Sequence, residues 1–123
     1  MKTTKNKIFG GFTTIPWDKT SGNKSDTSAF TFSVDLCSKY PVNPANAGNA
    51  IYCHSSYGPM FGSAHFFYIG NNSNTGNVSG FRPDCCSTYP NSPKAANGFS
   101  ALLDGEHTFQ VADMEVYKVS VVA

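Results

Sequence analysis

The sequence predicts a mostly β chain in which two antiparallel sheets pack against each other as a sandwich. Residues 29–36 alternate between apolar and polar side chains, which is the pattern of a strand with one buried face. No segment shows the period of an amphipathic helix, and leucine is scarce beside phenylalanine, tyrosine and valine. Polar stretches rich in glycine, proline and asparagine separate the apolar segments, as turns separate short strands. We therefore expect short antiparallel strands joined by loops.

The N-terminal half begins with a short apolar strand that leads into Gly10–Gly11 and the only tryptophan, Trp17. A polar loop at 18–26 leads to the strand 29–36, and a second loop occupies 40–49. A strand at 50–53, a turn at Gly58–Pro59 and a strand at 64–69 follow. In the strand 29–36 the core-facing side chains are predicted to be Phe30, Phe32, Val34 and Leu36.

The C-terminal half contains two long loops, at 70–80 and at 83–97. A strand at 99–103 and a turn at 104–105 precede the longest predicted strand, which begins at Thr108. In this last strand Phe109 and Val111 share one phase, whereas Met114 and Val116 share the opposite one. A bulge near 112–113 would turn both pairs inward, so we predict one there.

The charge content excludes several functions. Charged residues make up 14% of the chain and the net charge is +1, so no basic surface for nucleic acid or an anionic membrane is expected. No apolar run approaches the roughly 18 residues of a membrane span. The N-terminus also lacks the apolar core of a secretion signal. These features predict a soluble, intracellular, cytoplasmic protein.

The cysteines and histidines do not form a recognisable metal site or disulfide framework. Cys37 and Cys53 are isolated, and neighbouring side chains such as those of Cys85–Cys86 diverge in an extended segment. We expect reduced thiols, with a redox-responsive pair as the alternative. The three histidines lack convergent spacing, so we expect no metal and no cofactor.

Three segments occur in a characteristic order, namely residues 7–17 with Gly10, Gly11 and Trp17, residues 61–69 with Gly62 and His65, and residues 109–117 with Glu115. Taken together, they resemble the TLDc domain of the oxidation-resistance proteins. The resemblance runs over about residues 7–119 and implies a single TLDc-like β-sandwich with short peripheral helices. Because few residues precede Ile8, the chain is expected to correspond to a partial domain that lacks the family's N-terminal part.

Glu115 and His65 are the candidate catalytic residues. Glu115 matches the acidic position of the family's last motif, and the alternative is a structural role as a solvated carboxylate or a loop contact. His65 matches the family histidine, but Phe66 stands where the family has an acid, so the simplest His–Asp dyad is missing. For Trp17 we expect a place in the core, and for Gly10–Gly11 a close approach of strands or a bulge.

The leading hypothesis is a protein-interaction module whose loops contact a partner, with Asn71, Asn72, Asn74 and Asn77 as candidate contact residues. The resemblance implies a link to oxidative-stress protection and, as one partner, the vacuolar proton pump. Two alternatives stay open, namely a structural subunit of a large assembly and an enzyme of unknown activity that uses Glu115. Nucleic acid and membrane insertion are not expected.

Overall fold

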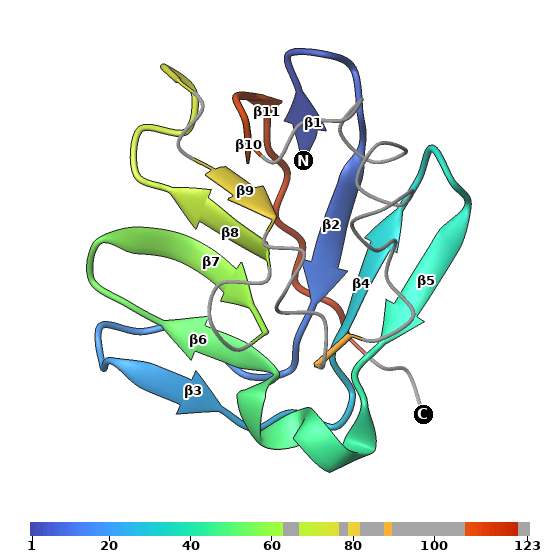
Figure 1. The fold of residues 1–123 in the computed structure, drawn as a ribbon, viewed down its shortest axis with the longest axis vertical. Coiled ribbons are helices and arrows are strands. Elements are labelled where there is room, and N and C mark those ends of the chain that lie inside the picture. Colours follow the sequence, from blue (N-terminus) through green and yellow to red (C-terminus); the bar gives the residue numbers. More distant parts are fainter. Residues whose placement is uncertain (63–66, 77–78, 82–87, 90–107, 121–123) are drawn as a thin grey trace.

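The computed structural model describes residues 1–62, 67–76, 79–81, 88–89 and 108–120 (Figure 1). The chain there is mostly β, which confirms the predicted fold class. One short helix, the 3-10 helix η1 (Pro44–Asn49), lies among these residues. The strands are β1 (Lys2–Thr3), β2 (Phe9–Phe12), β3 (Gly22–Lys24), β4 (Phe30–Ser33), β5 (Ser38–Pro41), β6 (Ile51–Cys53), β7 (Tyr57–Phe61), β8 (Phe67–Gly70), β9 (Ser79–Phe81), β10 (Thr108–Phe109) and β11 (Val111–Asp113).

The strands form two layers. One is a six-stranded sheet in the order β10-β9-β8-β7-β6-β3, and the other contains the three-stranded sheet β2-β4-β5. A two-stranded ladder, β1-β11, joins the second layer through a bridge between Lys2 and Ile8. The strand pairs are antiparallel, and Figure 1 shows the two groups of strands on opposite sides of the molecule. This arrangement agrees with the sandwich that the sequence predicts.

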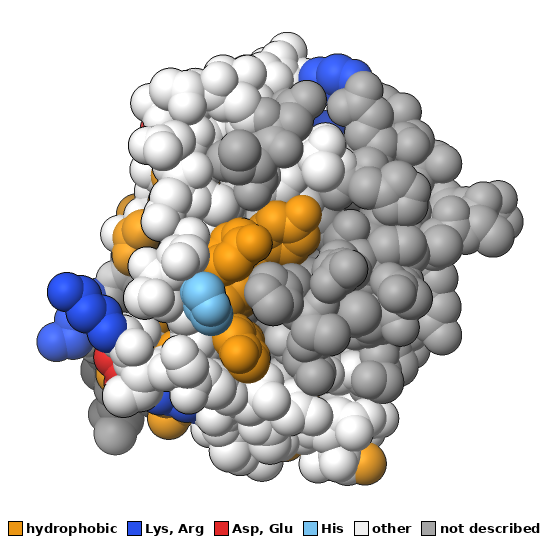
Figure 2. Space-filling view, turned by 60° about the vertical axis from the view of Figure 1, so that its left-hand side comes forward, with side chains coloured by type: hydrophobic (Ala, Val, Ile, Leu, Met, Phe, Trp, Pro, Cys, Tyr) orange, Lys and Arg blue, Asp and Glu red, His pale blue; other side chains and the backbone are white. Residues whose placement is uncertain are grey.

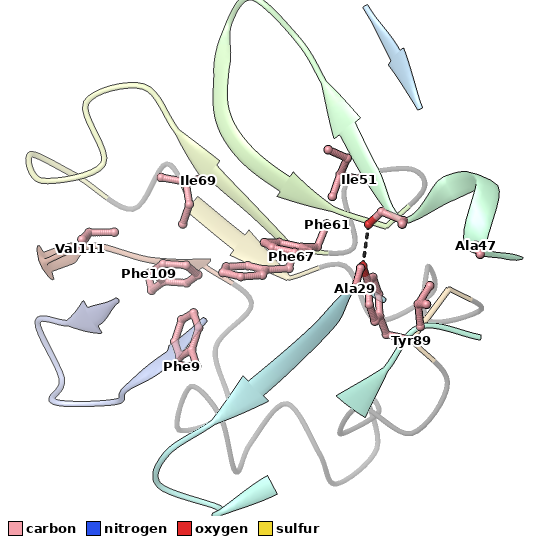
Figure 3. Packing of buried hydrophobic residues seen from close by; sticks show 12 residues of the cluster. Phe9, Ala29, Ala47, Ile51, Phe61, Phe67, Ile69, Tyr89, Phe109 and Val111 are labelled. Atoms are coloured by element: carbon pink, nitrogen blue, oxygen red, sulfur yellow. Dashed lines mark hydrogen bonds between the residues drawn. The ribbon is translucent and has the colours of Figure 1, made fainter. Parts of the chain in front are cut away.

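Aromatic rings fill the space between the layers (Figure 3). Phe9 of β2 packs edge-on against Phe67 of β8, with ring centroids 5.5 Å apart, and against Phe109 of β10 at 5.0 Å. Phe61 of β7 stacks on Phe67 at 5.7 Å. All four rings are buried, and burying each phenylalanine contributes about 1.5–3 kcal/mol. Phe9 therefore links β2 to the opposite sheet.

The glycine pair of β2 allows this close packing. A methyl group on Gly11 would lie 2.4 Å from the Phe61 ring, inside the distance at which atoms overlap. A methyl group on Gly10 would lie 2.8 Å from the tip of Phe32, on the other face of the sheet. The predicted close approach of strands or a bulge at Gly10–Gly11 is not what the structure shows, because the β2–β4 register is regular and it is side chains of two different strands that occupy the space the glycines leave.

The buried face of β4 is the opposite of the predicted one. Thr31 and Ser33 are only 4% and 2% exposed, whereas Phe30 and Phe32 are half-buried on the outer face. The large rings of Phe9 and Phe61 already occupy the inner face, so small side chains fit there. Phe32 instead packs over Gly10, and Phe30 stacks on Phe12 with centroids 5.1 Å apart. β4 also ends at Ser33, which leaves Val34 and Leu36 exposed in a turn.

The predicted long final strand is also wrong in part. β10 and β11 are separate short strands, and β11 ends at Asp113, whose carboxylate accepts a hydrogen bond from the Met114 N–H at 2.8 Å. Val111 pairs with Thr3, and Asp113 pairs with Lys2, the residue next to Thr3. Ala112 is therefore the extra residue of a bulge in β11. The bulge is therefore where we predicted it, but Met114 and Val116 are exposed rather than turned inward.

Several local predictions need correction. Gly58–Pro59 is not a turn but part of β7, where the register against β8 shifts. A proline is tolerated at such an irregularity because it has no N–H to donate to the ladder. Strands β3 and β5 occupy segments that were predicted as loop or left unassigned, and η1 lies in the predicted loop 40–49. The predicted strand at 99–103 lies outside the described residues.

Candidate functional site

The turn at residues 71–76, which we call the asparagine turn, connects β8 to the segment that leads into β9. Asn72 has a left-handed backbone, with φ of 59°, a conformation that asparagine adopts more readily than most residues. Its carbonyl accepts hydrogen bonds from the Thr75 N–H at 3.0 Å and from the Thr75 hydroxyl at 2.9 Å. At the base of the hairpin the Gly70 N–H donates to the buried Ser79 hydroxyl at 3.0 Å. The sequence therefore forms a closed, hydrogen-bonded turn.

Contacts with the chain near β11 fix the position of this turn. The Val111 N–H donates to the Ser73 carbonyl at 2.8 Å, and the Gln110 side-chain amide donates to the Asn74 carbonyl at 2.7 Å. These bonds use backbone carbonyls of the turn. The side chains of Asn71, Asn72 and Asn74 remain exposed, and Asn77 lies outside the described residues. The turn thus presents uncharged donors and acceptors on a fixed backbone, which suits a protein contact surface.

Glu115 lies in an exposed segment that follows β11. The Tyr117 hydroxyl donates a hydrogen bond to its carboxylate, and this bond raises the pKa of Tyr117. A catalytic carboxylate usually sits in a cleft with groups that perturb its pKa. Within the described parts of the chain, no group of three or more histidine, cysteine or acidic side chains lies close enough together to hold a metal ion. Glu115 is thus an exposed carboxylate that accepts a hydrogen bond from Tyr117 and interacts electrostatically with the Met1 amino group.

Trp17 and Gly62, two other residues of the family motifs, make packing and backbone contacts within the fold. Trp17 is half-buried at the edge of the core, where its indole N–H donates to the Met60 carbonyl at 3.1 Å and its ring packs edge-on against Phe61. Gly62 has a left-handed backbone with φ of 79° and donates its N–H to the Ala50 carbonyl at 2.9 Å. His65 lies outside the described residues. Trp17 therefore packs at the core, as the sequence predicts.

Sequence reasoning missed an aromatic patch on the six-stranded sheet, formed by Tyr52, His54, Tyr57 and Tyr68. The rings contact one another in series, with centroids 6.4 Å apart for Tyr52 and His54, 5.5 Å for His54 and Tyr57, and 5.9 Å for Tyr57 and Tyr68. His54 is the only histidine among the described residues, and Figure 2 shows it bordered by hydrophobic side chains. The His54 Nδ1 accepts a hydrogen bond from the Ser56 N–H at 3.0 Å. The alternation of Tyr52 with buried Ile51 and Cys53 is the sequence signal that could have revealed this outward face.

The cysteines that the structure describes are separated. Cys53 is buried in β6, and Cys37 is exposed in the turn before β5 with a left-handed backbone of φ 49°. Both are free thiols, and Cys85–Cys86 lies outside the described residues. His54 and Cys53 are sequence neighbours, but the histidine packs with the aromatic patch while the thiol is buried. The structure therefore does not form a cysteine–histidine pair there.

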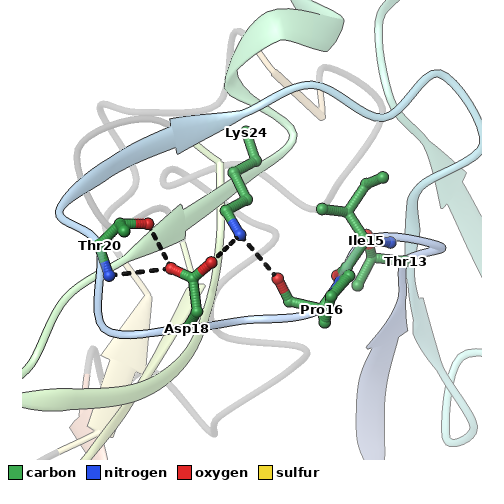
Figure 4. A network of polar contacts seen from close by, with 6 residues as sticks. All are labelled: Thr13, Ile15, Pro16, Asp18, Thr20 and Lys24. Atoms are coloured by element: carbon green, nitrogen blue, oxygen red, sulfur yellow. Dashed lines mark hydrogen bonds and ion pairs between the residues drawn. The ribbon is translucent and has the colours of Figure 1, made fainter.

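A charged network closes the loop between β2 and β3 (Figure 4). The Lys24 ammonium contacts the Asp18 carboxylate and donates to the Pro16 carbonyl at 3.1 Å. The Thr20 N–H donates to the same carboxylate at 2.9 Å. The hydrogen bond from Lys24, followed by those from Thr20, lowers the pKa of Asp18 to about 2. Because the pair is exposed to water, we assign it a small effect on stability.

Asp26 fixes the same loop from inside the protein. Its carboxylate accepts hydrogen bonds from the Thr13 hydroxyl at 2.6 Å, the Thr14 N–H at 2.7 Å and the Ser28 N–H at 2.9 Å. Burial, the largest single influence, raises the pKa of Asp26, but these hydrogen bonds together outweigh it and the net pKa is lowered. The residue is thus an ionised structural anchor. The two aspartates stabilise the loop.

Comparisons with known proteins provide one match. The model of the TLDc domain family matches residues 1–120. No curated protein and no solved structure matches the chain at a significant level. In the described part of the structure, none of the helices is long and apolar enough to cross a membrane.

Proposed function

We propose, since the chain belongs to the TLDc domain family, that it is a protein-interaction module whose contact surface includes the asparagine turn. The observation that supports this function is the combination of a fixed backbone and exposed amides at 71–76. A contact surface that is already ordered loses little conformational entropy when it binds. The uncharged side chains of the turn favour recognition by shape and hydrogen bonding over electrostatic attraction.

The proposed partner is the vacuolar proton pump, and the proposed place of action is the cytoplasm, with a role in protection against oxidative stress. The support for these details is the family membership. The small net charge of +1 is compatible with a contact based on hydrogen bonds.

The test measures binding of the chain to the purified soluble sector of the vacuolar proton pump by biolayer interferometry. The variant combines Asn71→Ala and Asn74→Ala with Asn72→Gly, because glycine keeps the left-handed backbone at position 72. The control is Asn23→Ala, which removes an exposed asparagine from β3. We expect about tenfold weaker binding for the triple variant, equivalent to about 1.4 kcal/mol. The control should bind like the wild type, and both should keep the wild-type melting temperature.

Three results would contradict the proposal. Absence of binding by the folded wild-type chain would remove the pump sector as the partner. Equal binding by the triple variant and the wild type would show that the asparagine turn is not part of the contact surface. A triple variant that binds weakly but has also lost its cooperative melting transition would count against the assignment too, because the turn would then act through folding.

A further inference from the structure

The aromatic patch of Tyr52, His54, Tyr57 and Tyr68 lies on the outer face of the six-stranded sheet. Tyr52 in β6 and Tyr68 in β8 each stand between two buried residues, so their side chains point to the face opposite the core. Tyr57 is 36% exposed, and the other three side chains are half-buried. Figure 2 shows His54 at the surface, bordered by hydrophobic side chains. Aromatic side chains gathered on one surface in this way are typical of a recognition surface.

The hydrogen bond from Ser56 determines which nitrogen of the His54 ring carries the proton. A backbone N–H can only donate, so Nδ1, which accepts from the Ser56 N–H at 3.0 Å, is unprotonated, and the neutral ring carries its proton on Nε2. His54 makes no other hydrogen bond in the described chain. Its contacts with the rings of Tyr52 and Tyr57 hold the plane of the imidazole. The patch therefore combines aromatic faces with a hydrogen-bond donor of fixed direction.

The strand positions next to the patch are uncharged. The residues that pair with its three tyrosines across the ladders are Asn23, Met60, Gly70 and Gly80. A charged ligand would find no opposite charge at these positions, and its own charge would lose water on binding. The surface therefore fits an uncharged ligand.

We propose that the aromatic patch binds a proline-rich segment of a partner protein in the polyproline II conformation. Proline rings are apolar, and aromatic surfaces are the usual binding sites for such segments. A polyproline II helix has no internal hydrogen bonds, so its carbonyls can accept from the His54 Nε2–H and from tyrosine hydroxyls. Proline has no N–H, so a bound proline places no unpaired donor against the rings.

Other uncharged ligands match the patch less well. An ordinary extended peptide brings an N–H donor with each residue, and each donor that loses water without finding an acceptor weakens binding. A sugar brings several hydroxyl donors, and the four members of the patch include no carboxylate or amide oxygen to accept from them. A proline-rich segment brings acceptors and apolar rings, which complement the donors and aromatic faces of the patch.

The patch is separate from the chain end and from the asparagine turn. The Met1 amino group bonds to Phe9 of β2, in the opposite layer, whereas the patch faces away from that layer. A ligand would contact side chains of the patch and not an edge of the sheet, so binding does not depend on an unpaired strand. The asparagine turn uses other residues, and the proposal holds even if that turn binds nothing.

The test titrates the complete chain, labelled with nitrogen-15, with a capped polyproline peptide of about nine residues, which form three turns of the helix. We expect saturable NMR shifts at the amides of Ser56 and Tyr57, because the Ser56 N–H bonds directly to the His54 ring. A capped glycine-serine peptide of the same length is the control probe. It is uncharged but flexible and lacks proline rings, so its shifts at the same concentration should be about tenfold smaller.

Two variants remove parts of the patch, and one variant is the matched control. His54→Asn removes the ring but keeps the turn, because asparagine accepts the same hydrogen bond from the N–H two residues on. Tyr57→Ala removes the ring that contacts both His54 and Tyr68. Each should weaken peptide binding about tenfold, and His54→Asn should keep the wild-type melting temperature. Tyr117→Ala removes a tyrosine that is 74% exposed outside the patch and should bind like the wild type.

Three outcomes would overturn the proposal. Absence of saturable shifts with the polyproline peptide would exclude this ligand, and shifts of the same amides by an uncharged glucose oligosaccharide would then assign the patch to sugars. Equal shifts with the glycine-serine peptide would show that the proline rings are not recognised. Wild-type affinity in the folded His54→Asn variant would show that the peptide binds elsewhere, whether or not Tyr57→Ala folds.

Discussion

Substitution of Gly11 by alanine tests the packing that joins the two sheets. The added methyl group would lie 2.4–2.7 Å from three atoms of the Phe61 ring. That ring cannot move freely, because it stacks on Phe67 and contacts Trp17 and Tyr89 edge-on. Overpacking of this kind costs about 1–3 kcal/mol, and we expect about 2 kcal/mol for Gly11→Ala. For a domain of this size the melting temperature should fall by roughly 6–10 °C.

The assay is thermal and urea unfolding followed by circular dichroism, with two further variants. Gly48→Ala is the matched control, because nothing lies within 4 Å of the added methyl group, and it should leave stability almost unchanged. Phe61→Leu removes the ring that the methyl group would meet, so Gly11→Ala should cost at least 1 kcal/mol less in that background than in the wild type. An equal cost in both backgrounds would refute the steric explanation, as would a Gly11→Ala variant with wild-type stability.

Three other variants test separate contacts. Asp26→Asn should destabilise the chain by about 2–3 kcal/mol at pH 7, since one amide cannot accept all the hydrogen bonds that the carboxylate accepts. The wild-type pKa of Asp26 is lowered, so its contribution is present above the unfolded pKa of about 3.9 and is lost as the pH falls through the folded pKa; urea unfolding from pH 7 to pH 2 should show a flatter profile for the variant. Tyr89→Phe should cost only about 0.5–1.5 kcal/mol in the same unfolding assay, because the Ala50 carbonyl that accepts its hydroxyl also accepts the Gly62 N–H. Glu115→Gln should change neither stability nor binding to the pump sector, and a variant that binds normally but loses a cellular activity would favour the enzyme alternative.

The sequence identifies the features that depend on one residue type at one position. Gly10 and Gly11 mark a place where something approaches closely because no other residue leaves that space, although the structure places the rings of Phe32 and Phe61 there rather than a second strand or a bulge. The bulge near 112–113 follows from a change of apolar phase within a few residues, and its position is correct. The consequence that we drew from it was wrong, because a phase change also occurs where a strand simply ends, as it does at Asp113.

The face that a strand buries is less predictable, because it depends on what the opposite sheet supplies. The alternation of β4 is clear in the sequence, but the core already contains Phe9, Phe61 and Phe67 from other strands. Small Thr31 and Ser33 fit under those rings, and Phe32 finds its place over Gly10 on the outside. Hydrophobicity alone assigns the larger side chains to the core, whereas packing volume decides the outcome here.

The asparagine turn, the candidate contact surface, could also be predicted only in part from the sequence. The exposed asparagines of 71–76 could be predicted as a loop from composition. Their fixed position could not, because the bonds to Ser73 and Asn74 come from Val111 and Gln110, far along the chain. The aromatic patch around His54 was missed for a related reason, since its three tyrosines come from β6, β7 and β8, whose pairing in the sheet is a tertiary property, and His54 lies just after β6.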